Sequence, residues 1–182
     1  NLFADKASFN SDISAWDVSA VTDMISMFKN AISFNGDLSS WDVSNVNYIS
    51  SMFDGATSFN GDLSFWDTSS LTGSLNFLFS GATSFNVDLS SWDVSNVSFM
   101  TSIFDGTDAL SEENKCAIHS TWQSNSAWPY DWSSSCQLCP PNNLVGVPTY
   151  NSVSLSWSEP GGCENYVINE LPFYDTGSNA SA

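Results

Sequence analysis

The chain has 182 residues, a net charge of −17 at pH 7, three lysines and no arginine. So acidic a chain cannot neutralise phosphate groups, which excludes nucleic-acid binding and argues against anionic membrane surfaces. No apolar run approaches the roughly 20 residues that a membrane-spanning helix needs. The charge suits a salty exterior, where repulsion between like charges is screened.

One motif occurs four times in the first part of the chain. The copies begin at Ser8, Ser33, Ser58 and Ser84 and read SFNSDISAWDVSAV, SFNGDLSSWDVSNV, SFNGDLSFWDTSSL and SFNVDLSSWDVSNV. Their tryptophans, Trp16, Trp41, Trp66 and Trp92, are spaced by 25, 25 and 26 residues. A period of this length indicates a solenoid, in which each unit buries its apolar face only against its neighbours.

Apolar residues recur at fixed slots of every copy. In the second copy they are Phe34, Leu38, Trp41, Val43, Val46, Ile49, Met52 and Phe53. The Trp41-Asp42-Val43 step alternates like a short strand, whereas residues 46–53 have the three-and-four spacing of a helical turn or two. A turn signal follows at Asp54-Gly55. We therefore expect one strand and one helical return per copy, stacked in parallel.

Two kinds of polar residue also repeat. An asparagine follows the phenylalanine in every copy, at Asn10, Asn35, Asn60 and Asn86. Such a column satisfies backbone groups at the bend between coils, so we expect a structural role in preference to a ligand contact. Aspartates form two further columns, Asp12, Asp37, Asp62 and Asp88, and Asp17, Asp42, Asp67 and Asp93.

The aspartate columns place like charges about 4.8 Å apart if the copies stack as parallel strands do. One explanation is that each carboxylate accepts backbone N–H groups of its own coil in an Asx turn. The other is that calcium bridges neighbouring coils through oxygen ligands, with Asp12, Asp37, Asp62 and Asp88 as the candidate metal column. Calcium is the one cofactor that the sequence suggests.

The repeat unit, with its M-x-x-M-F-x-G-A-like return, resembles the BspA-like leucine-rich repeats of bacterial, mycoplasmal and protist surface proteins. The resemblance covers residues 1 to about 107 and rests on Phe-Asn-x-Asp, Trp-Asp-x-Ser and the Met/Phe return, which recur in order. It implies an α/β repeat solenoid of leucine-rich-repeat type with short parallel strands. The third copy departs from the pattern at Thr68, and residues 71–79 carry the extra residue, so we expect a local bulge there.

Residues 108–138 are predicted to cap the last coil. Ser111 is a helix N-cap with acidic residues in the first turn after it, and the helix should run to about Trp122. Trp128, Tyr130 and Trp132 then supply apolar bulk. A solenoid needs an end that covers its last coil, and similar caps follow the repeat in the proteins that it resembles.

All four cysteines, Cys116, Cys136, Cys139 and Cys163, lie after the last repeat. An even, clustered set in such a chain indicates disulfides of an exported protein. Three pairings are possible, and we favour Cys116–Cys136 with Cys139–Cys163. The alternative is that the CQLC motif is half of a zinc or redox site. This fits poorly, because the only histidine of the chain, His119, is distant in sequence and there is no second pair of cysteine or histidine ligands.

From Cys139 the composition and pattern of the sequence change. Residues 139–175 resemble the opening three strands of a fibronectin type III domain, with Trp157 as its core tryptophan. Such a domain needs about 90–100 residues, so we expect a partial β-sandwich here. Residues 176–182 have the composition of a linker.

No residue set indicates catalysis. Glycoside hydrolysis needs two carboxylates in unlike environments, whereas a repeated column provides four that are alike. His119 has no titratable partner at a recognisable spacing. A nucleophile triad is also disfavoured, because the chain has many serines but only one histidine to act as the base. Asn96 and Asn179 begin N-x-S sequons and are candidate glycosylation sites.

These features predict a non-enzymatic repeat scaffold that is extracellular or exposed on the cell surface. As a structural subunit it would self-associate into a filament or surface assembly through repeat faces and strand addition. As an adhesin-like module it would bind a protein or glycan partner. Variation among copies at exposed slots would favour a ligand face, whereas uniform copies favour a lattice. The four copies are rather uniform, so the structural subunit is the predicted function and the adhesin-like module is the alternative.

Overall fold

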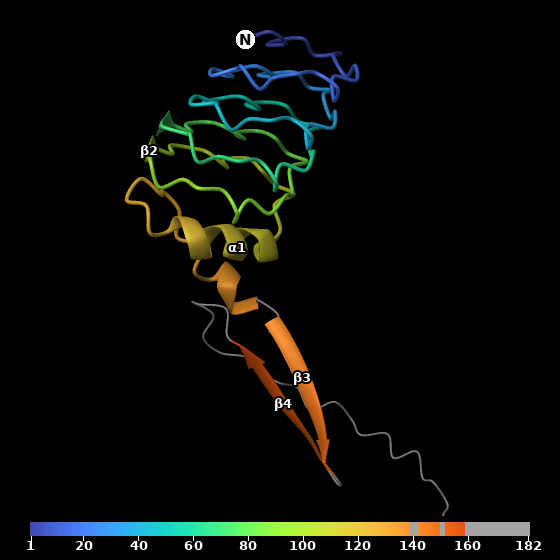
Figure 1. The fold of residues 1–182 in the computed structure, drawn as a ribbon, viewed down its shortest axis with the longest axis vertical. Coiled ribbons are helices and arrows are strands. Elements are labelled where there is room, and N and C mark those ends of the chain that lie inside the picture. The colour runs from blue at the N-terminus through green and yellow to red at the C-terminus, as the bar shows by residue number, and fades with distance from the viewer. Residues whose placement is uncertain (139–141, 150–151, 159–182) are drawn as a thin grey trace, which may run out of the picture.

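The computed structural model describes residues 1–138, 142–149 and 152–158. Figure 1 shows the repeat-bearing part of the chain as successive turns that lie one above another, with helix α1 (Glu112–Trp122) beneath the last of them. We call each turn a coil and name the first to fourth coils by their tryptophans, Trp16, Trp41, Trp66 and Trp92.

Backbone hydrogen bonds join each coil to the next at a spacing close to the sequence period. One column of them runs from Phe3 N to Met27 O, Phe28 N to Met52 O, Phe53 N to Leu78 O and Phe79 N to Ile103 O, each 2.9 Å long. The bonded residues hold neighbouring slots of successive copies. Because each coil satisfies the backbone of the next in this way, the period of the sequence is also the period of the structure.

The strands are short and lie elsewhere in the repeat than expected. β1 (Gly73–Ser74) pairs in parallel with β2 (Val97–Phe99), and Asp23 forms an isolated parallel bridge with Tyr48. The strand predicted at residues 41–43 is wrong, since those residues belong to no strand. Here the Asp42 carboxylate accepts the Ser44 N–H at 3.1 Å, and this local turn competes with ladder pairing.

The helical return predicted for residues 46–53 is also wrong. Turns occupy residues 50–55, and no helix lies in this segment. Ser51 has φ of 54° and Gly55 has φ of 71°, both in the left-handed region that ends a right-handed helix. The three-and-four spacing of the apolar residues therefore comes from consecutive turns that direct them inward.

The extra residue of the third coil lies at β1. Three positions separate Val46 from Ile49 and Val97 from Met100, but four separate Leu71 from Leu75. The register of the β1–β2 pair shifts between Gly73 and Ser74, and Gly73 has φ of 77°. The local bulge expected in residues 71–79 is thus present, and the glycine accommodates it because its backbone tolerates positive φ.

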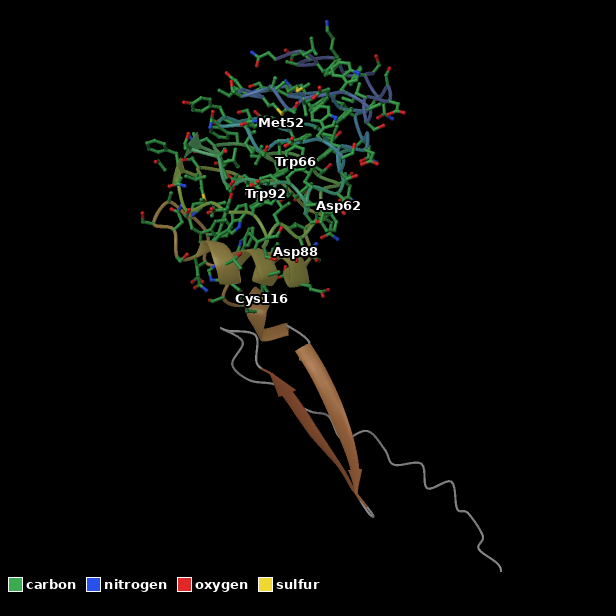
Figure 2. All side chains as sticks on the ribbon, viewed as in Figure 1. Met52, Asp62, Trp66, Asp88, Trp92 and Cys116 are labelled. Carbon is green, nitrogen blue, oxygen red and sulfur yellow. A yellow bond between two sulfur atoms is a disulfide. The ribbon has the colours of Figure 1, made fainter. Side chains whose placement is uncertain are left out.

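The core consists of aromatic columns that run through the stack. All eight apolar slots identified in the second copy are buried, as predicted. Phe28, Phe53, Phe79 and Phe104 stack with centroid distances of 5.6, 5.5 and 5.7 Å, and Phe34, Phe59 and Phe85 form a second column at 5.8 and 6.2 Å. Figure 2 shows Trp66 and Trp92 inside the stack, one above the other. Each buried aromatic ring removes roughly 150–250 Å² from water, so few leucines are needed.

Each buried tryptophan of the repeats also bonds the coil before it. The indole Nε1 of Trp41 donates to Ile13 O, that of Trp66 to Leu38 O and that of Trp92 to Leu63 O, at 3.1, 3.0 and 2.9 Å. The third coil adds a bond of its own, because the Thr68 hydroxyl accepts the Asp93 N–H at 2.8 Å. Thr68 replaces the valine of the other copies, and its buried hydroxyl is hydrogen-bonded, so the replacement leaves no unpaired polar group.

The cap continues the columns of the repeats. Helix α1 begins after Ser111, whose side chain accepts the Asn114 N–H at 3.2 Å, and it ends at Trp122, as predicted. The ring of Trp122 is fully buried and stacks on Trp92 at 6.3 Å. A disulfide joins Cys116 of α1 to Cys136 in the 3₁₀ helix Ser135–Leu138, with Cα atoms 4.6 Å apart.

Beyond the cap, β3 (Asn142–Thr149) and β4 (Ser152–Ser158) form an antiparallel pair. The pairing runs from Thr149 with Ser152 to Asn142 with Ser158, with one irregularity. These strands cover part of the segment predicted to open a β-sandwich. The third predicted strand, at residues 166–168, and the Cys139–Cys163 pair lie outside the described residues.

Candidate functional surface

The eight column aspartates form the outer corners of the coils. Each accepts the backbone N–H of the serine two residues later, at 2.8–3.1 Å. The Asx turns expected as one explanation of the columns are therefore present in all four copies. Asp62 and Asp88 lie one above the other on one side of the stack in Figure 2.

These bonds stabilise the charged form of the carboxylates. The pKa of six of them lies below its ordinary value, chiefly because of hydrogen bonds from the hydroxyl and backbone N–H of the following serine; the six are Asp12, Asp17, Asp37, Asp42, Asp67 and Asp93. The negative charges of Asp67 and Asp17 raise the pKa of Asp42, but this effect is smaller than the lowering by the hydrogen bonds. These six carboxylates therefore stay ionised despite the repulsion between neighbouring coils.

Within the described ranges, no group of three or more His, Cys, Asp or Glu side chains is arranged to hold a metal ion. Asp12, Asp37, Asp62 and Asp88 each bond within their own coil. Calcium bridging between coils is not needed to explain these bonds and stays a prediction, which a chelator can test.

The asparagine column has the structural role expected of it. Each side-chain Oδ1 accepts the backbone N–H of the next asparagine in the column, at 2.9 Å for Asn10 to Asn35 and 2.8 Å for the next two steps. At the last coil, Asn86 Oδ1 accepts the Ser111 N–H at 3.0 Å and the Asn114 amide at 2.8 Å. The column thus ends on the N-cap of α1 and positions the cap.

His119 is built into the cap. Its Nδ1 accepts the Trp128 indole N–H at 3.0 Å, and its side chain is buried. Tyr130 accepts the Phe104 N–H at 3.0 Å and donates to Asp105 at 2.7 Å, and burial raises the pKa of its hydroxyl. These side chains attach the cap to the last coil.

Of the two candidate glycosylation sites, the structure describes Asn96. Asn96 is exposed in the turn that precedes β2. Asn179 lies outside the described residues.

A different feature stands out on the strand-bearing side of the stack. Tyr48, Phe77 and Phe99 lie one each on the second, third and fourth coils and are 47%, 41% and 60% exposed. We call these three residues the aromatic row. Tyr48 forms the bridge with Asp23, Phe77 follows β1 by three residues, and Phe99 ends β2.

The bulge in the third coil shapes the row. Tyr48 lies over Gly73, where a Cβ atom would come 3.7 Å from the tyrosine ring. Phe77 has φ of 57°, in the left-handed region that large side chains rarely adopt. β2 lies at the left of the stack in Figure 1, and Asp62 lies at the right in the same view in Figure 2. In this view β2, which carries Phe99, and Asp62 of the first aspartate column therefore lie on opposite sides of the stack.

Sequence reasoning missed the row, although a signal for it exists. At the slot of Tyr48 and Phe99 the first coil has Asp23 and the third has Ser74, and at the slot of Phe77 the other coils have Ser26, Ser51 and Ser102. Aromatic residues thus replace polar ones at slots that do not serve the core. A comparison of copies that searched for such exceptions would have found all three.

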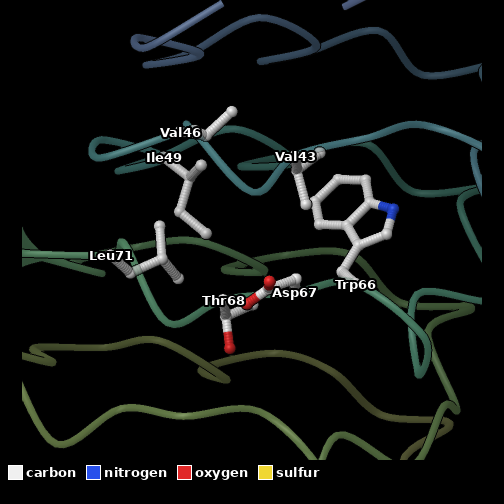
Figure 3. Close-up of a pocket in the computed structure, with 7 residues that line it drawn as sticks. All are labelled: Val43, Val46, Ile49, Trp66, Asp67, Thr68 and Leu71. Carbon is white, nitrogen blue, oxygen red and sulfur yellow. The ribbon is translucent and has the colours of Figure 1, made fainter. Parts of the chain in front are cut away.

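A small cavity lies within the stack of coils. Figure 3 shows a cavity of about 10 Å³ between the second and third coils, lined by Val43, Val46, Ile49, Trp66, Asp67, Thr68 and Leu71. A cavity of this size holds about one water molecule. It is a small packing defect beside the irregular third copy.

The fold and surface define a repeat protein whose coils bond through their backbones and differ mainly in what they expose. The chain belongs to the family described as "Mycoplasma protein of unknown function, DUF285", whose model matches residues 1–74 and 65–127. This family is found in BspA-like surface repeat proteins. No curated protein and no solved structure matches the chain.

Among the helices of the described residues, none is both long and apolar enough to span a membrane.

Proposed function

We propose that this chain is a non-enzymatic, extracellular scaffold of leucine-rich-repeat type that presents the aromatic row as a binding face for a protein or glycan partner. The observation that carries the proposal is the exposure of Tyr48, Phe77 and Phe99 at slots where other copies have polar residues. Exposed aromatic rings cost solubility, and exposed apolar surface of this kind marks interaction sites where it is extensive.

The chemistry of the row suits recognition. Aromatic side chains are enriched at binding interfaces because they bury a large area and lose little conformational entropy. A tyrosine adds a hydroxyl that can hydrogen-bond at the edge of the contact. The coils beneath are tied together by backbone bonds and stacked rings, so the three side chains are held on a regular support.

Family membership supports a surface location, since the matching family occurs in surface repeat proteins. The non-enzymatic part of the proposal follows from the chemistry of the titratable groups. The aspartates share one environment, the Asx turn, and His119 has its Nδ1 engaged by Trp128. Acid–base catalysis needs groups that differ in environment and face one reacting centre.

A row variant tests the proposal with residues that the chain already uses. Tyr48→Ser, Phe77→Ser and Phe99→Ser are combined, because serine occupies the same slots in other coils. Wild type and variant are passed over immobilised matrix proteins and glycans, and binding is measured by biolayer interferometry. Phe65→Ser is the matched control, since Phe65 is 83% exposed at a slot where Ser40 and Ser91 stand in other coils.

We expect at least one immobilised ligand to bind wild type and the Phe65 variant but not the row variant. Equal binding by the row variant and wild type would overturn the row as the binding face.

A second function, a structural subunit of a surface assembly, is favoured by one observation. The aspartate turns are the same in all four coils, as the contacts of a lattice would require. Copies could join through these faces with a bridging cation, or through strand addition to β3 or β4. Electron microscopy with calcium and with a chelator separates the two, because only a subunit would form ordered fibres.

A further inference from the structure

A hollow lies where the last coil meets the cap. It has a volume of about 250 Å³ and is lined by Trp92, Asp93, Val94 and Ser95 from the coil and by Thr121, Ser124 and Asn125 from the cap. Figure 1 shows α1 directly beneath the coil that holds β2. Elsewhere a coil packs on a coil of the same shape, but here a straight helix and its following turn meet a coil, and space remains between them.

The side-chain donors around this hollow are already used. Thr121 Oγ1 donates to Ile118 O at 3.1 Å, and Ser124 Oγ donates to Thr121 O at 3.3 Å. Both hydrogens of the Asn125 amide are taken, by Val94 O at 2.7 Å and Val97 O at 2.9 Å. The Trp92 indole N–H donates to Leu63 O at 2.9 Å.

Acceptors remain in the hollow. Asp93 accepts the Ser95 N–H at Oδ1, at 2.9 Å, and a further hydrogen bond from the Ser95 hydroxyl. An ionised carboxylate has about four lone-pair sites, so it can accept more hydrogen bonds than these. The Thr121 and Ser124 hydroxyl oxygens keep their lone pairs, because a hydroxyl that donates can still accept. Asp67 of the neighbouring coil is close enough to act on the Asp93 charge. The hollow is therefore negative and offers acceptors.

We propose that this hollow binds the ammonium or guanidinium group of a lysine or arginine side chain from a partner protein. A group with several N–H donors and a positive charge matches a carboxylate flanked by hydroxyl oxygens. A metal ion fits less well, because a single carboxylate supplies little of the charge that calcium sites use.

The occupant comes from another molecule. The chain has three lysines and no arginine, and Lys29 and Lys115 are paired with Asp54 and Glu112, each at 2.7 Å. Lys6 belongs to the N-terminal end of the stack, which lies opposite the cap (Figure 1). A net charge of −17 also steers basic partners toward the surface. This inference is independent of the aromatic row, so either can fail without the other.

The test is an NMR titration of the full chain, labelled with ¹⁵N, in about 0.15 M salt so that diffuse attraction is screened. The probes are acetyl-Gly-Lys-Gly-amide, its arginine analogue and its norleucine analogue. We expect the first two to shift the amides of residues 93–96 and 121–125, and the norleucine peptide to leave them unchanged.

Asp93→Asn should weaken peptide binding about tenfold or more, because it removes the charge from a charge-assisted hydrogen bond. The matched control is Asp42→Asn, which alters the same column and the same Asp-x-Ser turn two coils away from the hollow. Ser124→Arg provides a second variant that fills the hollow with a tethered guanidinium and should abolish the shifts while Asp93 stays in place.

Three results would overturn the proposal. Equal weakening by Asp42→Asn and Asp93→Asn would show diffuse attraction to the whole acidic column. Full binding by Ser124→Arg would place the peptide elsewhere. Larger shifts of the same amides with calcium chloride than with the peptides would make the hollow a metal site.

Discussion

Asp-x-Ser turns show how one short polar pattern shapes each coil. Asp42 accepts the Ser44 N–H at 3.1 Å and the Ser44 hydroxyl at 2.6 Å, and the equivalent turns recur in every copy. The same bonds fix the corner of the coil and keep the carboxylate charged. In the sequence, the repeated aspartates resemble a column of metal ligands. The hydrogen bonds of the turns are enough to explain why an aspartate recurs at these positions.

The turns make stability depend on pH with a definite sign. The folded-state pKa of Asp42 is lowered, so its contribution is present above the ordinary value near 3.8 and is lost as pH falls through the lowered value. Ser44→Ala removes the largest cause of that shift. We predict that the variant melts below wild type at pH 6 and that the gap closes on acidification below pH 3.8. Differential scanning calorimetry measures this, and a gap that does not depend on pH would contradict it.

A column of left-handed residues offers a second test at single positions. Asp5, Asn30, Gly55, Gly81 and Gly106 have φ between 54° and 74°. A Cβ at Gly81 would lie 3.7 Å from its nearest neighbour, so space is not limiting and the backbone alone sets the cost. Gly81→Ala should lose about 1 kcal/mol in urea denaturation, and Gly81→Asn less, since asparagine tolerates this conformation. Equal losses for both variants would mean that φ is not the cause.

At the scale of the elements, each coil depends on its neighbours for its interior bonds. Trp66 donates to Leu38 O of the coil before it, and Leu38 O also accepts the Trp41 N–H. Trp66→Phe keeps an aromatic ring but loses the indole bond, and should lower the free energy of unfolding by about 1 to 2 kcal/mol. Trp16→Phe is the control, because Trp16 is 44% exposed and should change stability little. Equal losses from both would contradict a role for the buried bond.

The disulfide is expected to hold the cap. It spans 20 residues and joins α1 to the 3₁₀ helix. Replacement of both Cys116 and Cys136 by serine should cost about 3 kcal/mol, as closing a loop of this length in the unfolded chain does. Urea denaturation followed by tryptophan fluorescence measures the loss. A loss below about 1 kcal/mol would mean that the aromatic contacts of Trp122 and Trp128 suffice.

The sequence predicts buried positions better than local backbone shape. The apolar slots, the helix of the cap and the asparagine column follow from periodicity and capping chemistry, which act locally or repeat strictly. The strand at residues 41–43 and the helical return do not occur, because Asx turns and left-handed residues interrupt them. The aromatic row was missed because it follows no period: it is an exception to the repeat.

At the scale of the whole molecule, the residues that build the stack differ from those that we propose for binding. Buried rings and backbone bonds between coils use the repeated residues, whereas Tyr48, Phe77 and Phe99 occupy slots that vary. Surface residues that serve binding contribute little to folding, and exposed aromatic rings persist where function requires them. We therefore expect the fold to remain stable without the aromatic row.

One measurement tests that claim without knowledge of the partner: the free energy of unfolding, in urea, of the combined Tyr48→Ser, Phe77→Ser and Phe99→Ser variant. Surface substitutions usually change stability by about 0.5 kcal/mol or less each. Serine already stands at these slots in other coils, including the left-handed slot of Phe77. We therefore predict a variant within about 1 kcal/mol of wild type. A loss of more than about 3 kcal/mol would show that the row belongs to the folded core and would contradict its assignment as a binding face.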